Sequence, residues 1–143
     1  MLDSIMLTMK AHQLKLFNIA KALALTSEHE KAHIGAVIVC GKDVVSVGVN
    51  GNKSHPLQKQ YNKYRFDDDR ASHLLHAELD AIIRARPYIK NGNASIYIYR
   101  VLRNGEIGMS KPCAGCERAL NDYRIHNIFY TTEQGYAHYE VLT

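Results

Sequence analysis

Two short segments constrain this chain most strongly: the tripeptide His76-Ala77-Glu78 and a Pro-Cys-Ala-Gly-Cys stretch at residues 112–116. Together they supply one imidazole, two thiols and one further carboxylate. Zinc favours imidazole and thiolate ligands, and three protein ligands leave one tetrahedral position open, as in catalytic rather than structural zinc sites. The sequence therefore predicts a zinc site held by His76, Cys113 and Cys116, with Glu78 as the general acid and base beside it.

The spacing within each segment predicts where two helices begin. Cys113 and Cys116 are three residues apart, so both sulfurs face one side of a first helical turn. A proline suits the entry to such a helix, and the free N–H groups there favour thiolate over thiol. His76 and Glu78 are two residues apart and would diverge on a regular helix. They converge only if a helix starts near His76, between residues 74 and 77.

Hydrophobic periodicity predicts an α/β layered domain around these segments. Helical spacing of apolar residues predicts a helix over residues 11–28, and apolar runs predict a hairpin of strands at 34–40 and 44–49. A polar loop over 50–70 leads to a second helix that Pro87 closes. A strand at 96–102, a loop over 103–111, a helix at 113–123 and a strand at 127–132 follow, while residues 133–143 fit no single assignment. We expect residues 1–143 to form one domain.

Composition and charge are those of a soluble globular domain, with 46% hydrophobic and 22% charged residues. No apolar run reaches the ~18 residues of a membrane span, and the first seven residues lack the signals of a secretory leader. Three cysteines, two of them close together, argue against a disulfide scaffold and for a cytoplasmic location. The net charge of +4 suits an anionic ligand, although mildly basic enzymes without a nucleic-acid partner are more common.

A Cys-x-x-Cys pair also occurs in redox sites and in structural zinc knuckles. A closed structural site needs a fourth ligand, for which His73 is the nearest candidate, although an exposed loop position is the more ordinary interpretation of this residue. Cys40 ends an apolar strand, where we expect a buried small hydrophobic residue. The two segments occur together, in this order and each at a predicted helix start, which favours the catalytic interpretation.

These residues resemble the cytidine and deoxycytidylate deaminase superfamily, whose members carry H-x-E followed by P-C-x-x-C. The likeness runs from the first predicted helix to the last predicted strand, and includes the run at 34–39 and the later Asn50. It implies a three-layer α-β-α fold with a central mixed sheet, bound Zn²⁺ and a homo-oligomer. It further implies hydrolytic deamination of a cytosine nucleotide or nucleoside, of the dCMP-to-dUMP type, by a zinc-activated water with Glu78 as proton shuttle.

The resemblance also implies that Asn50 contacts the sugar and that the backbone of Ala77 helps to hold the base. Asn50 has an alternative role as the cap of a turn. Lys53 and Arg65, in the predicted loop, are our candidates for a 5′-phosphate. The same loop is also suited to stacking on a single nucleic-acid strand, or to closing the site as a solvated segment or subunit interface.

Two departures from the family pattern stand out. Typical deoxycytidylate deaminases carry a proline- and glycine-containing stretch with an extra cysteine or histidine after the asparagine. This chain has residues 51–56 there instead, which argues against the allosteric nucleotide regulation of those enzymes in this chain. Residues 133–143 are also few for the additional helix and parallel strand of many nucleotide and tRNA deaminases.

Three functions therefore stay open at this point. The chain is a deaminase of free cytosine nucleotides or nucleosides, a deaminase of cytosine or adenine within single-stranded DNA or RNA, or a non-catalytic zinc-stabilised binding module. Glu78 argues against the third, since a structural zinc site has no use for it.

Overall fold

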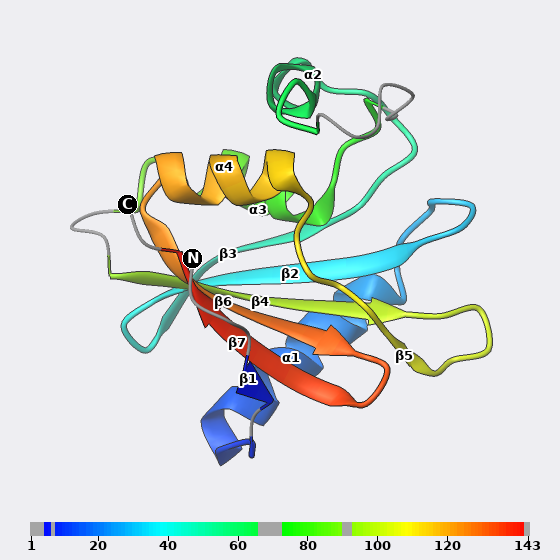
Figure 1. Cartoon of the computed structure of the whole chain (residues 1–143), viewed down its shortest axis with the longest axis vertical. Helices are drawn as coiled ribbons and strands as arrows, with labels where there is room; N and C mark the ends of the chain where they lie inside the picture. The colour runs from blue at the N-terminus through cyan, green and yellow to red at the C-terminus, as the bar shows by residue number, and fades with distance from the viewer. Residues whose placement is uncertain (1–4, 7, 66–72, 90–92, 142–143) are drawn as a thin grey trace.

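The chain folds around a seven-stranded mixed sheet (Figure 1). The computed structural model describes residues 5–6, 8–65, 73–89 and 93–141. Its strands are β1 (Ile5–Met6), β2 (His33–Cys40), β3 (Asp43–Val49), β4 (Ala94–Val101), β5 (Ile107–Gly108), β6 (Ile125–Thr132) and β7 (Gly135–Glu140). Its helices are α1 (Ala11–Ala24), α2 (Pro56–Asn62), α3 (Ala77–Ala85) and α4 (Ala114–Asp122).

The direction of the strands decides where the helices start. The strand order is β1-β7-β6-β4-β2-β3, and β5 pairs with the end of β4. Strand β2 lies between β3 and β4 and is antiparallel to both, so β3 and β4 run in the same direction. Strand β6 pairs with β4 in parallel, whereas β7 pairs with β6 as an antiparallel hairpin. The segments after β3 and after β4 therefore leave the sheet at the same end.

Helices cover both faces of the sheet, which confirms the predicted three-layer α-β-α fold (Figure 1). Helix α1 packs on one face, against Tyr97 and Tyr99 of β4. Helices α3 and α4 pack on the opposite face, against Ile96 and Ile98, with α2 next to α4. Successive side chains of a strand point to opposite faces, so this alternation splits the core in two. Among the described residues, no helix is long and apolar enough to cross a membrane.

The predicted boundaries hold at the two positions that matter for the site. Helix α3 begins at Ala77, directly after His76, and α4 begins at Ala114, directly after Cys113. The first helix ends at Ala24, four residues earlier than predicted. The residues 133–143, left unassigned by the sequence pattern, contain the whole of β7, and β5 lies inside the loop predicted over 103–111.

The polar loop predicted over residues 50–70 is wrong in part, because Pro56–Asn62 form α2. The side chain of His55 caps this helix by accepting the N–H of Leu57 at 3.0 Å. The buried side of α2 includes Gln58 and Asn62, which are polar, so apolar periodicity did not reveal the helix. Residues 66–72 of the predicted loop and its surroundings lie outside the described residues.

Backbone contact at Gly48 sets the position of α3 on the sheet. A Cβ built on Gly48 would collide with the carbonyl oxygen of Ala77 and would lie 2.5 Å from the amide nitrogen of Ala81. Such backbone groups cannot move aside as a flexible side chain does. The helix that follows His76 therefore lies directly against strand β3.

We expect Gly48→Ala to destabilise the protein, because its methyl group would push α3 away from β3. The free energy of unfolding should fall by roughly 1–3 kcal/mol, measured by urea denaturation followed by circular dichroism. Gly51→Ala is the matched control, since the nearest atom to a Cβ there is 3.9 Å away; its effect should stay below about 1 kcal/mol. Equal stability of the two variants would contradict this account of the packing.

Candidate metal centre and active site

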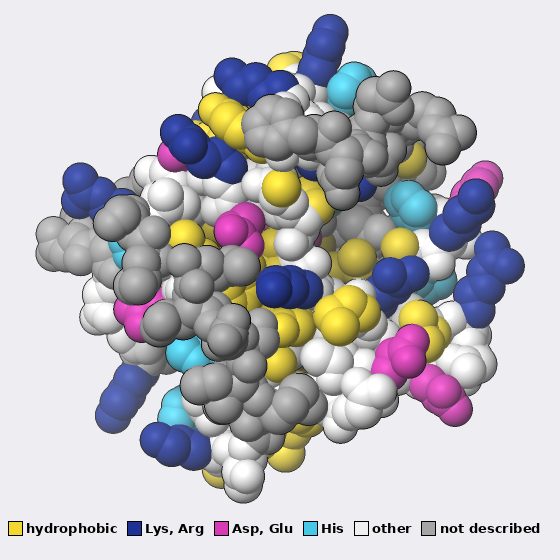
Figure 2. Space-filling view, viewed as in Figure 1, with side chains coloured by type: hydrophobic (Ala, Val, Ile, Leu, Met, Phe, Trp, Pro, Cys, Tyr) yellow, Lys and Arg dark blue, Asp and Glu magenta, His cyan; other side chains and the backbone are white. Residues whose placement is uncertain are grey.

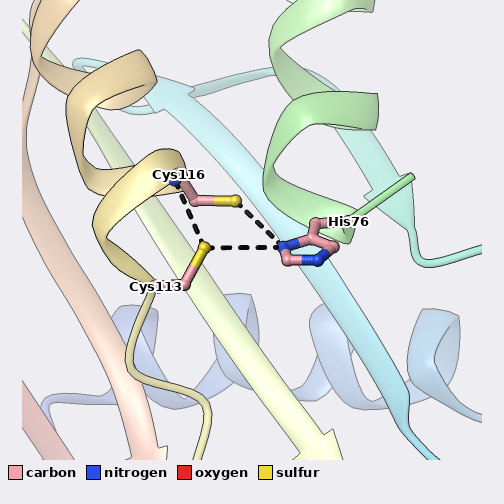
Figure 3. Close-up of side chains that lie close together, drawn as sticks. All are labelled: His76, Cys113 and Cys116. Atoms are coloured by element: carbon pink, nitrogen blue, oxygen red, sulfur yellow. Dashed lines mark hydrogen bonds between the residues drawn. The ribbon is translucent and has the colours of Figure 1, made fainter. Parts of the chain in front are cut away.

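Two helix starts bring three metal-ligating side chains together (Figure 3). His76 is the N-cap of α3, and its Nδ1 lies 3.2 Å from the sulfur of Cys116 and 3.8 Å from that of Cys113. The ligand atoms of the three residues all lie within 4.8 Å of one another. This is the group that the sequence predicted, and the ring atom facing both sulfurs is Nδ1.

The donor set fits zinc. One imidazole nitrogen and two sulfurs are preferred zinc ligands, and three of them leave one tetrahedral position open. The pKa of Cys113 is lowered to about 4, first by a hydrogen bond from the Cys116 side chain and also by His76 and the backbone N–H of Cys116. The pKa of Cys116 is raised well above its usual value, because its thiol is hydrogen-bonded to Cys113 and is buried. One thiolate is therefore already formed at neutral pH, as a zinc ligand must be.

Glu78 lies on the first turn of α3, beside the three ligand residues. It is 5% exposed, and burial raises the pKa of its carboxyl group. A carboxyl with a raised pKa can both accept and return a proton near neutral pH. Burial alone would lower the pKa of His76, but its contacts with Cys113 and Glu78 outweigh burial and the pKa is raised.

Two of the three ligand residues border a cavity of about 330 Å³. His76, Glu78 and Cys113 line it together with Asn50 and Arg65. A volume of this size lies at the lower end of the range for small-molecule sites. The cavity therefore suits a ligand of modest size that reaches Glu78.

Helix α2 supports the metal group through a chain of polar contacts. The Oε1 atom of Gln58 accepts the backbone N–H of His76 at 2.9 Å, and its Nε2 atom donates to Asn62 at 2.8 Å. Asn62 in turn donates to Nδ1 of His73 at 2.9 Å. His73 is exposed, as expected, and lies outside the metal group. Gln58 is fully buried, so it holds the backbone of His76 in a fixed position.

The residues predicted to contact substrate fall into different places. Asn50 and Arg65 line the cavity, whereas Lys53 is exposed and not among its described lining residues. Ala77 is buried at the start of α3, where helix N–H groups lack partners within the helix. The side chain of Asn50 also holds the backbone, since it accepts the N–H of Ile34 at 2.9 Å and donates to the carbonyl of Ala32 at 2.7 Å.

Sequence analysis missed other cavity residues, among them His29, Arg100 and Lys111. For Arg100 a signal existed: it follows Ile96 and Ile98 with a period of two and therefore shares their face of the sheet. His29 and Lys111 lie in connecting segments, and no periodicity predicts which way such side chains point.

Comparison with known proteins identifies the family. Residues 10–132 match the model for the cytidine and deoxycytidylate deaminase zinc-binding region, so the chain belongs to this family. A probable deoxycytidylate deaminase of Caenorhabditis elegans is 29% identical over 129 residues, which cover 85% of this chain and 57% of that protein. The chain spans about half the length of the curated relatives that it matches.

Solved structures show the same fold. The dCMP deaminase of the cyanophage S-TIM5, in apo form, aligns with a TM-score of 0.61 at 15% identity, over 87% of this chain and 86% of that one. A cytidine deaminase of Burkholderia pseudomallei aligns with a TM-score of 0.62 at 18% identity, over 92% and 93%. These identities are low, so the likeness concerns the fold.

We expect zinc binding to depend on the three clustered residues and not on the remaining cysteine. Cys116→Ala should lower the zinc content from about one ion per chain to a small fraction of that, because two ligands hold zinc poorly. Cys40→Ala, at the end of β2, should retain the wild-type content. Elemental analysis after dialysis against a weak chelator measures both. Full zinc retention in Cys116→Ala would show that the ligand set is wrong.

We expect Gln58 to support zinc binding without touching the metal. Gln58→Leu leaves the backbone N–H of His76 without its acceptor, so zinc affinity should fall by about 10- to 100-fold, measured by competition with a chromogenic chelator. Gln60→Leu changes an exposed glutamine of the same helix and should bind zinc as the wild type does. The same affinity in both variants would remove Gln58 from the support of the site.

Proposed function

We propose that this protein is a zinc-dependent deaminase that converts cytosine to uracil in a free nucleotide or nucleoside, with dCMP as its preferred substrate. Membership of the deaminase family supports this reaction class. The observation that carries the proposal is Glu78, a buried carboxylate in a cavity wall that it shares with His76 and Cys113. A purely structural zinc site has no need for such a carboxylate, which argues against a non-catalytic binding module.

The reaction requires proton transfers that Glu78 is placed to perform. Zinc, held by His76, Cys113 and Cys116, would lower the pKa of water toward ~7. Glu78 accepts the proton of that water and delivers it to N3 of the cytosine ring as oxygen bonds to C4. It then takes the remaining proton from the oxygen now bonded to C4 and passes it to the amino group, and the bond between C4 and this nitrogen breaks to release ammonia. One water is consumed, and the base, still attached to its sugar, becomes uracil.

Asn50, Ala77, Arg65 and Lys53 stay our candidates for holding the substrate. Asn50 sits in the cavity wall with its amide already oriented by backbone contacts, which supports a role toward the sugar. Arg65 also lines the cavity and suits a phosphate. Lys53 receives no such support, because its side chain is exposed and it is not among the described residues that line the cavity.

A nucleic-acid substrate is the second candidate, because the cations of the cavity also suit a backbone phosphate. On the face of the molecule that Figure 2 presents, the visible Lys and Arg side chains are scattered rather than joined in one stripe. A track for a single strand combines a continuous basic groove with stacked aromatic rings, so this view favours the free nucleotide. Homo-oligomer formation and a cytoplasmic location stay predictions.

We expect Glu78→Gln to abolish turnover while the protein keeps its fold and its zinc. Loss of a general acid and base typically costs 10²–10⁴-fold, so the rate of dCMP deamination, followed by ultraviolet absorbance, should fall by at least about 100-fold. Glu106→Gln, which neutralises an exposed glutamate between β4 and β5, is the control and should retain full activity. Wild-type turnover in a zinc-loaded Glu78→Gln variant would refute this mechanism.

A further inference from the structure

Arg100 occupies a position where the sheet otherwise buries apolar side chains. It follows Ile96 and Ile98 on the face of β4 that carries α3 and α4, and both isoleucines are fully buried. On either side, its backbone pairs with Ile34 of β2 and with Gly108 of β5. A charged residue on a core-facing position needs a partner for its charge. Arg100 lines the cavity that also contains Glu78.

The guanidinium group of Arg100 has an unmet hydrogen bond. Its Nε atom is buried and has no hydrogen-bond partner among the described residues. Buried donors in proteins are almost always paired, and an unpaired one is costly. Nε is itself covered by protein atoms, so a ligand would pair with the part of the Arg100 side chain that lines the cavity and would balance its charge.

Other groups around the cavity also offer donors. The Nδ1 atom of His29 accepts backbone N–H groups of Lys31 and Ala32 at 3.1 and 3.0 Å. A neutral imidazole whose Nδ1 accepts a hydrogen bond carries its hydrogen on Nε2. The Nε2–H group of His29 is therefore the donor available to a ligand. Arg65 and Lys111 line the same cavity, and Glu78 is the acidic residue in the described lining. Apart from Glu78 and the metal-ligating Cys113, the charged groups of the described lining are cations, so this part of the cavity suits an anion.

The strand end that carries Arg100 is held rigidly. The Oγ1 atom of Thr131 accepts the N–H of Arg100 at 3.2 Å and donates to the carbonyl of Gly108 at 2.7 Å. Ser110 donates to the carbonyl of Ile98 at 2.9 Å. A Cβ at Gly108 would lie 3.3 Å from Cδ of Arg100, so the glycine leaves room for the arginine stem. Fixed donors lose little entropy when they bind an anion.

We propose that Arg100, assisted by His29, binds a phosphate group of the substrate and makes the enzyme select a phosphorylated cytidine over the free nucleoside. This inference rests on the proposed deaminase function and assigns a substrate class to the same cavity. Arginine suits the role because its planar fork pairs with two phosphate oxygens at once. A free nucleotide and a nucleic-acid strand both present phosphate, and the experiment below separates these two sources.

The test compares Arg100→Gln with Arg103→Gln. Arg103 is exposed in the segment between β4 and β5, where it bonds the carbonyl of Glu30, so its replacement removes the same charge outside the cavity. We expect Arg100→Gln to lower the ratio of kcat/KM for dCMP to kcat/KM for deoxycytidine by about 10- to 100-fold. Arg103→Gln should leave the ratio within about threefold of the wild type. An unchanged ratio in Arg100→Gln would overturn the proposal.

Binding of dUMP, measured by calorimetry, tests the phosphate site without any turnover. The dissociation constant should rise by about 10- to 100-fold in Arg100→Gln and stay unchanged in Arg103→Gln. If dUMP binding depends on Arg100 as expected but the wild type deaminates neither dCMP nor deoxycytidine, the proposed function fails while the phosphate site stands. The third ligand is a single-stranded oligonucleotide with one cytosine. If Arg100→Gln weakens binding of the oligonucleotide but not of dUMP, the phosphate that Arg100 binds belongs to a nucleic-acid strand. Equal binding of all ligands by both variants refutes the phosphate site.

Discussion

The position of β2 between two strands that run opposite to it is the constraint on which the site depends. Because β3 and β4 flank β2 and share a direction, the segments that follow them leave the sheet at one end. Helices α3 and α4 therefore start near each other, although His76 and Cys113 are far apart in the chain. Ligand sites in α/β sheets commonly lie at the carboxyl ends of strands for the same reason. The zinc ligands meet because strand direction brings two helix starts together.

This arrangement concentrates negative charge in a buried place. The carboxyl of Glu78 lies on the first turn of α3 and Cys113 caps the start of α4, and the charge of Cys113 adds to the burial that disfavours ionisation of Glu78. At Cys113 the Cys116 side chain, the contact with His76 and the helix start offset part of that cost. A divalent cation would offset far more, so metal binding and stability of the two helix starts are coupled in this fold.

The sequence predicted the parts of the molecule that follow from local pattern. Cys-x-x-Cys spacing and the need for His76 and Glu78 to converge located both helix starts, and apolar runs located the central strands. Helix α2 escaped because its buried side carries Gln58 and Asn62, which satisfy each other by a hydrogen bond rather than by apolar contact. Arg100 escaped because its position in the alternation matters only once the cavity above β4 is known. Tertiary pairing of polar groups leaves no periodic trace in a sequence.

The residues around the cavity come from two kinds of position, helix starts on one hand and strand ends or connecting segments on the other. The zinc ligands, and the proton transfer that we propose for Glu78, lie at helix starts, where backbone N–H groups and fixed spacing impose the geometry. Donors suited to a phosphate come instead from the end of β4 and from connecting segments, with Arg100 and His29 as the examples. Connecting segments tolerate change better than helix starts on a sheet. A change at a strand end or in a loop can therefore alter the phosphate donors without disturbing the metal ligands, and Arg100, beside the short strand β5, is at such a position.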